Sequence, residues 1–143
     1  MKYFTMEELC YSAKAVELGI KNEPDALVKA KMIAFVENVL DKARARFGKP
    51  IVVNSGYRCA ELNKAVGGSA TSQHQKGEAV DITAQDKADN AILWDILCDI
   101  GKYDQLIWEK GNDAHPQWIH ISYREPMRMQ KLRTRDGIHY TLL

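Results

Sequence analysis

Residues 72–84 read Ser-Gln-His-Gln-Lys-Gly-Glu-Ala-Val-Asp-Ile-Thr-Ala, and their second half carries the pattern of a β-strand. Apolar residues at positions 80, 82 and 84 alternate with Asp81 and Thr83, as expected for a strand with one buried face. His74 lies before this strand in a polar segment, positions 69–77, which has no periodic pattern and which we expect to be a loop. The stretch therefore presents an imidazole and, seven residues later, a carboxylate that points away from the core.

A second strand is predicted at residues 118–123, and its first five residues, Trp-Ile-His-Ile-Ser, show the same alternation. His120 is expected on the face opposite the two isoleucines. If the two strands are neighbours, His74, Asp81 and His120 converge, and two imidazoles with one carboxylate form a known catalytic zinc pattern that keeps a fourth position for water. A single His or Asp is more often an ordinary surface or core residue, so the spacing alone is a weak indication.

Helices are predicted before and between the strands. A capping box at residues 5–8 predicts a helix from residue 6 to about residue 18. A long amphipathic helix is expected over residues 24–47, because eight apolar residues recur there at helical spacing: Val28, Met32, Phe35, Val36, Val39, Leu40, Ala43 and Phe47. Shorter elements complete the pattern, with strands at 51–53, 104–109 and 118–123 and helices at 59–66 and 92–100.

These elements predict an α+β fold in which N-terminal helices pack on a small, largely antiparallel sheet that carries the zinc site. The tail from residue 124 onward is basic, and its pattern favours neither helix nor strand. At 143 residues, the length suits a single domain spanning residues 1–143, which we expect to be monomeric.

The overall composition excludes several classes of protein. Twenty basic and 19 acidic side chains leave a formal charge of +1, which gives no indication of a nucleic-acid partner. The three cysteines form no C-x-x-C pair, so neither a disulfide framework nor a thiolate zinc site is indicated. No apolar run is long enough for a signal peptide or a membrane span, so we expect synthesis as a soluble cytoplasmic chain without a membrane partner.

Three sequence blocks together resemble a known family. The blocks are Ser55-Gly56-Tyr57-Arg58, Ser72-x-His74-x-x-Gly77-x-Ala79-x-Asp81 and Trp118-Ile119-His120. In this order they are similar to the zinc D-Ala-D-Ala carboxypeptidase family, which includes vancomycin-resistance dipeptidases and phage endolysins and is related to the Hedgehog zinc fold. The resemblance implies one Zn²⁺ ion, with His74, Asp81 and His120 as its ligands. It also implies a bacterial cell-wall peptide as substrate, with Arg58, Ser72 and Trp118 as candidate substrate-binding residues.

The general base is the point at which this sequence departs from part of that family. Several relatives have an acidic residue three positions before the last ligand, where this chain has Gln117, which cannot accept a proton. His115 is one substitute, because an imidazole titrating near neutrality suits proton transfer. Glu109, at the end of the strand predicted at 104–109, is the other, and we favour it. For Glu109, His115 and Arg58 alike, an ordinary structural or surface role is the alternative.

We therefore expect a zinc peptidase that hydrolyses stem-peptide bonds of peptidoglycan, as a D-Ala-D-Ala carboxypeptidase or an endolysin-type endopeptidase. The expected lack of a signal peptide favours a phage lytic enzyme that reaches the cell wall at lysis, and a cytoplasmic dipeptidase or wall-recycling enzyme would fit the same fact. The alternative from another class is a non-catalytic zinc-bearing module that binds wall peptides or a protein partner, to which Gln117 gives support. A purely structural domain without metal is the third reading.

Overall fold

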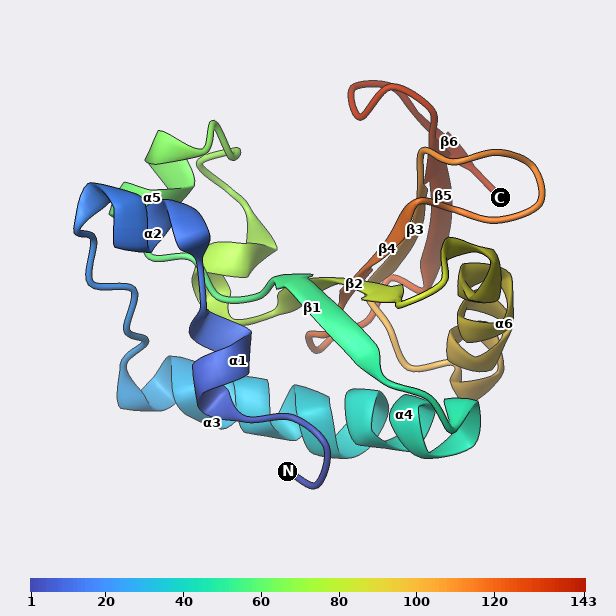
Figure 1. Cartoon of the computed structure of the whole chain (residues 1–143), viewed down its shortest axis with the longest axis horizontal. Helices are drawn as coiled ribbons and strands as arrows, with labels where there is room; N and C mark the ends of the chain where they lie inside the picture. The colour runs from blue at the N-terminus through green and yellow to red at the C-terminus, as the bar shows by residue number, and fades with distance from the viewer.

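The computed structural model describes residues 1–143 and contains a six-stranded sheet of order β1-β2-β4-β3-β5-β6. The strands are β1 (Ile51–Ser55), β2 (Ala79–Ala84), β3 (Gln105–Glu109), β4 (Trp118–Ser122), β5 (Gln130–Thr134) and β6 (Tyr140–Leu142). Neighbouring strands are antiparallel except β3 and β5, which are parallel. The predicted α+β fold with a largely antiparallel sheet is confirmed, and β2 and β4 are direct neighbours (Figure 1).

A long helical rod packs against the sheet (Figure 1). It consists of α3 (Ala26–Phe35), the π-helical turn η1 (Val36–Leu40) and α4 (Asp41–Phe47). Asp25 caps its start by accepting a 2.9 Å hydrogen bond from the Val28 amide, and Gly48 ends it in the left-handed conformation. Of the eight apolar residues expected on its inner face, seven are buried and Val28 is partly buried against the same core. The predicted helix is confirmed, and the π-helical turn is an addition that periodicity did not reveal.

The N-terminal helix predicted over residues 6–18 is wrong in one respect, because the chain forms two helices there. They are α1 (Met6–Cys10) and α2 (Ala13–Leu18). Thr5 caps the first as predicted, accepting a 3.1 Å hydrogen bond from the Glu8 amide. Ser12 accounts for the break, since its hydroxyl accepts a 3.1 Å hydrogen bond from the Ala15 amide and so starts a second helix.

The remaining helices lie between the strands. They are α5 (Ala60–Ala65), the 3₁₀ turns η2 (Gln73–Lys76) and η3 (Lys87–Asp89), and α6 (Asn90–Ile100). The segment 69–77, expected to be an irregular loop, thus contains the short helical turn η2, which carries His74. The unassigned tail forms β5 and β6; every residue of β6 is exposed, so no burial pattern marks that strand in the sequence. None of the helices combines the length and the apolar character that crossing a membrane requires.

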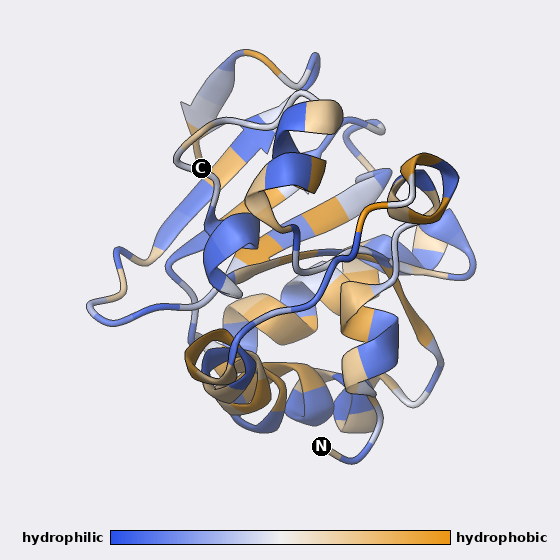
Figure 2. Cartoon of the chain, turned by 90° about the vertical axis from the view of Figure 1, so that its left-hand side faces the viewer, coloured by the Kyte–Doolittle hydropathy of each residue, from blue (hydrophilic) through white to orange (hydrophobic).

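The two faces of the sheet have different chemistry. Alternate residues of β2, β3 and β4 join the long helix and α6 in one core of 20 buried hydrophobic residues; those from these three strands are Val80, Ile82, Ala84, Leu106, Ile119 and Ile121. In Figure 2, hydrophobic colouring marks the central strands and alternates with hydrophilic residues along the helices. Because successive side chains point to opposite faces, burying this set turns the intervening residues toward the other face.

Candidate metal centre and substrate cleft

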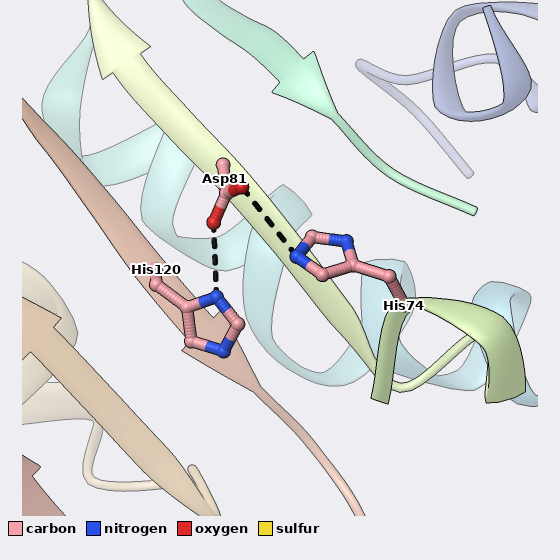
Figure 3. Close-up of side chains that lie close together, drawn as sticks. All are labelled: His74, Asp81 and His120. Carbon is pink, nitrogen blue, oxygen red and sulfur yellow. Dashed lines mark hydrogen bonds and ion pairs between the residues drawn. The ribbon is translucent and has the colours of Figure 1, made fainter. Parts of the chain in front are cut away.

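The three predicted ligands come together on the polar face of the sheet (Figure 3). Asp81 on β2 and His120 on β4 are direct cross-strand partners, so their side chains point to the same side. His74 approaches from the turn η2. The Asp81 carboxylate lies between the two rings, with Oδ1 2.9 Å from His120 Nδ1 and Oδ2 3.4 Å from His74 Nε2.

The His74 ring is oriented by the backbone of a neighbouring segment. Its Nδ1 lies 2.8 Å from the carbonyl oxygen of Gly56. Because a carbonyl only accepts hydrogen bonds, Nδ1 carries the proton and donates, which leaves the lone pair of Nε2 facing Asp81. Ordering of a ligand imidazole by a backbone carbonyl on its second nitrogen is common at metal sites.

Gly56 can hold that carbonyl in place because it has no side chain. A Cβ atom at this position would meet the Leu9 carbonyl oxygen at 2.1 Å, and the same oxygen accepts a 2.8 Å hydrogen bond from the Tyr57 amide. The segment after β1 is therefore pressed against α1. Gly56 thus links the N-terminal helix to the orientation of His74.

The electrostatics of the triad favour an ionised carboxylate. Burial alone would raise the pKa of Asp81, but its interactions with His120 and His74 outweigh burial and hold that pKa well below its usual range. Asp81 thus presents a negative charge to two imidazole nitrogens inside a partly buried site.

This donor set fits a metal ion. One ligand atom from each of the three residues lies within 4.8 Å of the others. The separations of 2.9 and 3.4 Å between the carboxylate oxygens and the imidazole nitrogens are near the spacing of about 3.4 Å expected for two ligands on one tetrahedral zinc ion. With Nδ1 donating to Gly56, the Nε2 lone pair of His74 faces a carboxylate oxygen, and a cation between the two atoms would bind both. Two imidazoles and one carboxylate form a three-ligand set of the kind found at catalytic zinc sites.

The triad lies in a cleft of about 570 Å³ whose walls are mostly polar. The predicted substrate-binding residues Arg58, Ser72 and Trp118 all line it. Ser72 connects two of the predicted residues, since its hydroxyl accepts a 3.2 Å hydrogen bond from the His74 amide and one of 3.4 Å from Arg58 Nη2. The Nε–H of Arg58 is buried without an acceptor and remains a free donor in the wall of the cleft.

The two candidate bases occupy different environments. Glu109 lines the cleft at the end of β3, on the same face as Ile107, the cross-strand partner of His120. Burial raises the pKa of Glu109 and is the largest influence on it. His120 opposes this increase, the charge of Asp81 adds a smaller one, and Lys110 lowers the pKa least. His115 does not line the cleft, and its Nδ1 lies 3.4 Å from the Pro116 carbonyl oxygen in the β3–β4 loop. The structure therefore brings Glu109, and not His115, into the cleft with the triad.

Several residues in the cleft wall or directly behind it were not singled out from the sequence. Asp104 is fully buried and joins Gln73 of η2 to Arg128 of the β4–β5 loop. Arg124 and Arg128 line the cleft, and both belong to the tail for which the sequence pattern gave no element. Their contacts are made between residues far apart in the chain, so neither periodicity nor a local motif marks them. The only sequence signal is that Arg124 closely follows the ligand strand β4.

The sequence model of the peptidase M15 family matches residues 2–122, which include all three members of the triad. The chain belongs to the peptidase M15 family. The resemblance drawn from the three sequence blocks is therefore confirmed. A comparison with curated proteins finds no match for the chain.

Membership makes this M15 peptidase a hydrolase of the metallopeptidase class, in a zinc-dependent family that acts on peptidoglycan-type substrates. The His74, Asp81 and His120 cluster is the group in this M15 peptidase that can hold a metal ion. The match ends at Ser122, so the β4–β5 loop with its two arginines lies beyond the matched residues.

Proposed function

We propose that the protein is a zinc peptidase that hydrolyses stem-peptide bonds of bacterial peptidoglycan, as a carboxypeptidase or an endolysin-type endopeptidase. The observation that carries this proposal is the position of Glu109, a buried carboxylate in the same cleft as the His74, Asp81 and His120 cluster. A binding module would have no need for a proton acceptor beside the metal ligands. The family match and the resemblance of the three blocks support the substrate class.

In this proposal His74, Asp81 and His120 hold the zinc ion. When bound, zinc supplies Lewis acidity that polarises the scissile carbonyl and makes water a better nucleophile near neutral pH. The Nδ1–H···O=C contact to Gly56 keeps His74 in the tautomer that a ligand requires.

Glu109 takes the proton of the attacking water and returns it to the nitrogen of the leaving amine, so that the peptide bond is replaced by a carboxyl and an amino group. The raised pKa of its carboxyl suits this exchange, because a carboxylate of ordinary pKa holds a proton too weakly near neutral pH. Arg58, with its free Nε–H, stabilises the negative charge that develops on the carbonyl oxygen or holds a substrate carboxylate. Trp118 forms part of the cleft wall with the Lys110 ammonium 5.4 Å from its ring centre.

The deciding experiment is mass spectrometry of stem peptides incubated with the zinc-loaded protein and its Glu109→Gln, His115→Ala and Glu17→Gln variants. Glu109→Gln keeps the shape but cannot accept a proton, so we expect a rate loss of about 10²-fold or more. His115→Ala and the exposed control Glu17→Gln should cleave as the wild type does. Elemental analysis should find one zinc per chain in every variant.

Two results would contradict the proposal. Full activity in Glu109→Gln would remove Glu109 from the mechanism, and a loss confined to His115→Ala would transfer the role to that residue. Retention of wall peptides by the zinc-loaded wild type with no new amino or carboxyl ends would favour the non-catalytic module. We further propose a monomer that reaches the wall through phage lysis, which size measurement and detection of the protein in lysates would check.

A further inference from the structure

The cleft carries more positive than negative charge. Four cationic side chains line it, Arg58, Lys76, Arg124 and Arg128, against two carboxylates, Asp81 and Glu109. A divalent ion at the triad adds to this excess. A partly enclosed cleft with a surplus of one sign concentrates groups of the opposite sign, so the cleft suits an anionic substrate.

Arg128 is held in the cleft wall by a buried carboxylate. Asp104 has no exposed surface, and its Oδ1 accepts hydrogen bonds from the backbone amide of Arg128 at 2.9 Å and from Arg128 Nε at 3.0 Å. Its Oδ2 accepts from Arg128 Nη2 at 2.7 Å and from Gln73 Nε2 at 2.9 Å. These four bonds use the acceptor capacity of the carboxylate and neutralise one guanidinium.

Arg124 is therefore a second cation at a carboxylate that is already satisfied. Its Nε lies 3.6 Å from Asp104 Oδ2, beyond hydrogen-bond distance, and is buried with no acceptor. A charged N–H without an acceptor is costly, and 37% of the Arg124 side chain is exposed at the cleft wall, so its guanidinium is available to an acceptor that arrives from outside. A purely structural role for Asp104 requires only Arg128, and Arg124 adds to it a longer ion pair without a hydrogen bond.

The position of this pair along the sheet defines what it can contact. Asp104 comes directly before β3, three residues from Ile107, which is the cross-strand partner of His120. Three residues of a strand span roughly 10 Å, so the arginines lie about that far along β3 from the triad. Glu109 lies in the opposite direction along the same strand. A peptide extended along β3 would place its scissile bond at the triad and a residue two or three positions away beside the arginines.

We propose that Arg124 and Arg128 form a second anion subsite, positioned by Asp104, which binds a carboxylate two or three residues from the scissile bond of an acidic peptide. This inference rests on the proposed function and narrows its substrate class to peptides with an internal free carboxylate. Asp104 holds the Arg128 guanidinium in place, and Arg124 supplies the donor that has no hydrogen-bond partner. The subsite is separate from Arg58, which lies on the wall formed by the segment between β1 and η2.

The test compares two synthetic stem peptides that differ only in whether the internal carboxylate is free or converted to a carboxamide. Wild type should show a KM about tenfold lower for the acidic peptide, as expected for a charge-assisted hydrogen bond. Arg124→Gln should abolish this preference by raising KM for the acidic peptide, with kcat retained. Arg124→Gln is chosen because it leaves all four hydrogen bonds of Asp104 in place, whereas Arg128→Gln could unfold the loop. Arg135→Gln, an exposed arginine outside the cleft, is the matched control and should retain the preference.

Calorimetric binding of the same two peptides separates this inference from the proposed function. If no peptide is cleaved but the acidic one binds about tenfold more tightly and only through Arg124, the subsite stands and the peptidase proposal fails. If both peptides are cleaved with equal KM, or if Arg124→Gln keeps the preference, the subsite is refuted and the peptidase proposal stands.

Discussion

Replacement of Asp104 by asparagine should destabilise the fold by far more than the exchange of one carboxylate oxygen for an NH₂ group suggests. Asparagine keeps the size of the side chain but has a single acceptor oxygen. If that oxygen accepts from the Arg128 amide and Nε, the new NH₂ group faces Arg128 Nη2 and Gln73 Nε2. All three of these groups are donors, so neither hydrogen bond can form. Two hydrogen bonds to the buried side chain are lost, and the partly exposed Arg128 guanidinium loses its counter-charge; together these changes destabilise the fold by about 3 kcal/mol.

The assay is urea denaturation followed by far-ultraviolet circular dichroism, with a parallel thermal melt. A loss of this size corresponds to a fall in Tm on the order of 10 °C for a chain of this length. Asp113→Asn is the matched control, because Asp113 also contacts two arginines, Arg133 at 2.8 Å and Arg135 at 3.3 Å, but its side chain is 81% exposed. That variant should lose far less stability, because ion pairs between exposed side chains contribute little. Equal losses of unfolding free energy in the two variants would show that burial of Asp104 contributes nothing to stability, which would refute the reasoning.

Two further predictions concern acid stability and the support of His74. Burial opposes ionisation of Asp104, but the hydrogen bonds from Arg128 and Gln73 lower its pKa from 3.8 to about 2. The ionised carboxylate therefore contributes about 2 kcal/mol to the free energy of unfolding above pH 3.8, and this contribution is lost as the pH falls toward 2. Denaturation curves of the wild type should show this loss, and those of Asp104→Asn should lack it. Gly56→Ala should lower the free energy of unfolding by about 1–3 kcal/mol and weaken zinc binding, because the new Cβ forces the Leu9 carbonyl and the segment next to His74 apart. Ser55→Ala is the control. Unchanged zinc affinity in Gly56→Ala would contradict the role of Gly56 in orienting His74.

The sequence predicts the parts of this protein that depend on one face being buried. Alternation at residues 80–84 and 118–122 correctly assigned Asp81 and His120 to the polar face, because the intervening apolar residues lie in the core. The adjacency of these two strands could not be read from alternation, which says nothing about which strands pair. The resemblance of the three blocks supplied it, and the direct pairing of Asp81 with His120 is the structural outcome.

Features that depend on contacts between distant residues were out of reach. Ser12 breaks the first helix although the apolar pattern continues through it, since capping by a single hydroxyl competes with periodicity. The partners of Asp104 come from η2 and from the β4–β5 loop, 31 and 24 residues away. The carbonyl of Gly56 that orders His74 carries no side-chain signal at all. The exposed strand β6 likewise leaves no burial pattern to detect.

The pairing of Asp81 with His120 has a consequence for how this scaffold can change. A shift of one residue between β2 and β4 would reverse the faces of the strand that moved, turning Asp81 or His120 inward and exposing Ile82 or Ile119 to water, so the apolar interior enforces the geometry of the ligands. The ligand side chains themselves do not set the register of the two strands. Substitutions at the triad would therefore abolish chemistry while leaving a sound architecture, and descendants of such a chain are free to lose catalysis and keep their shape.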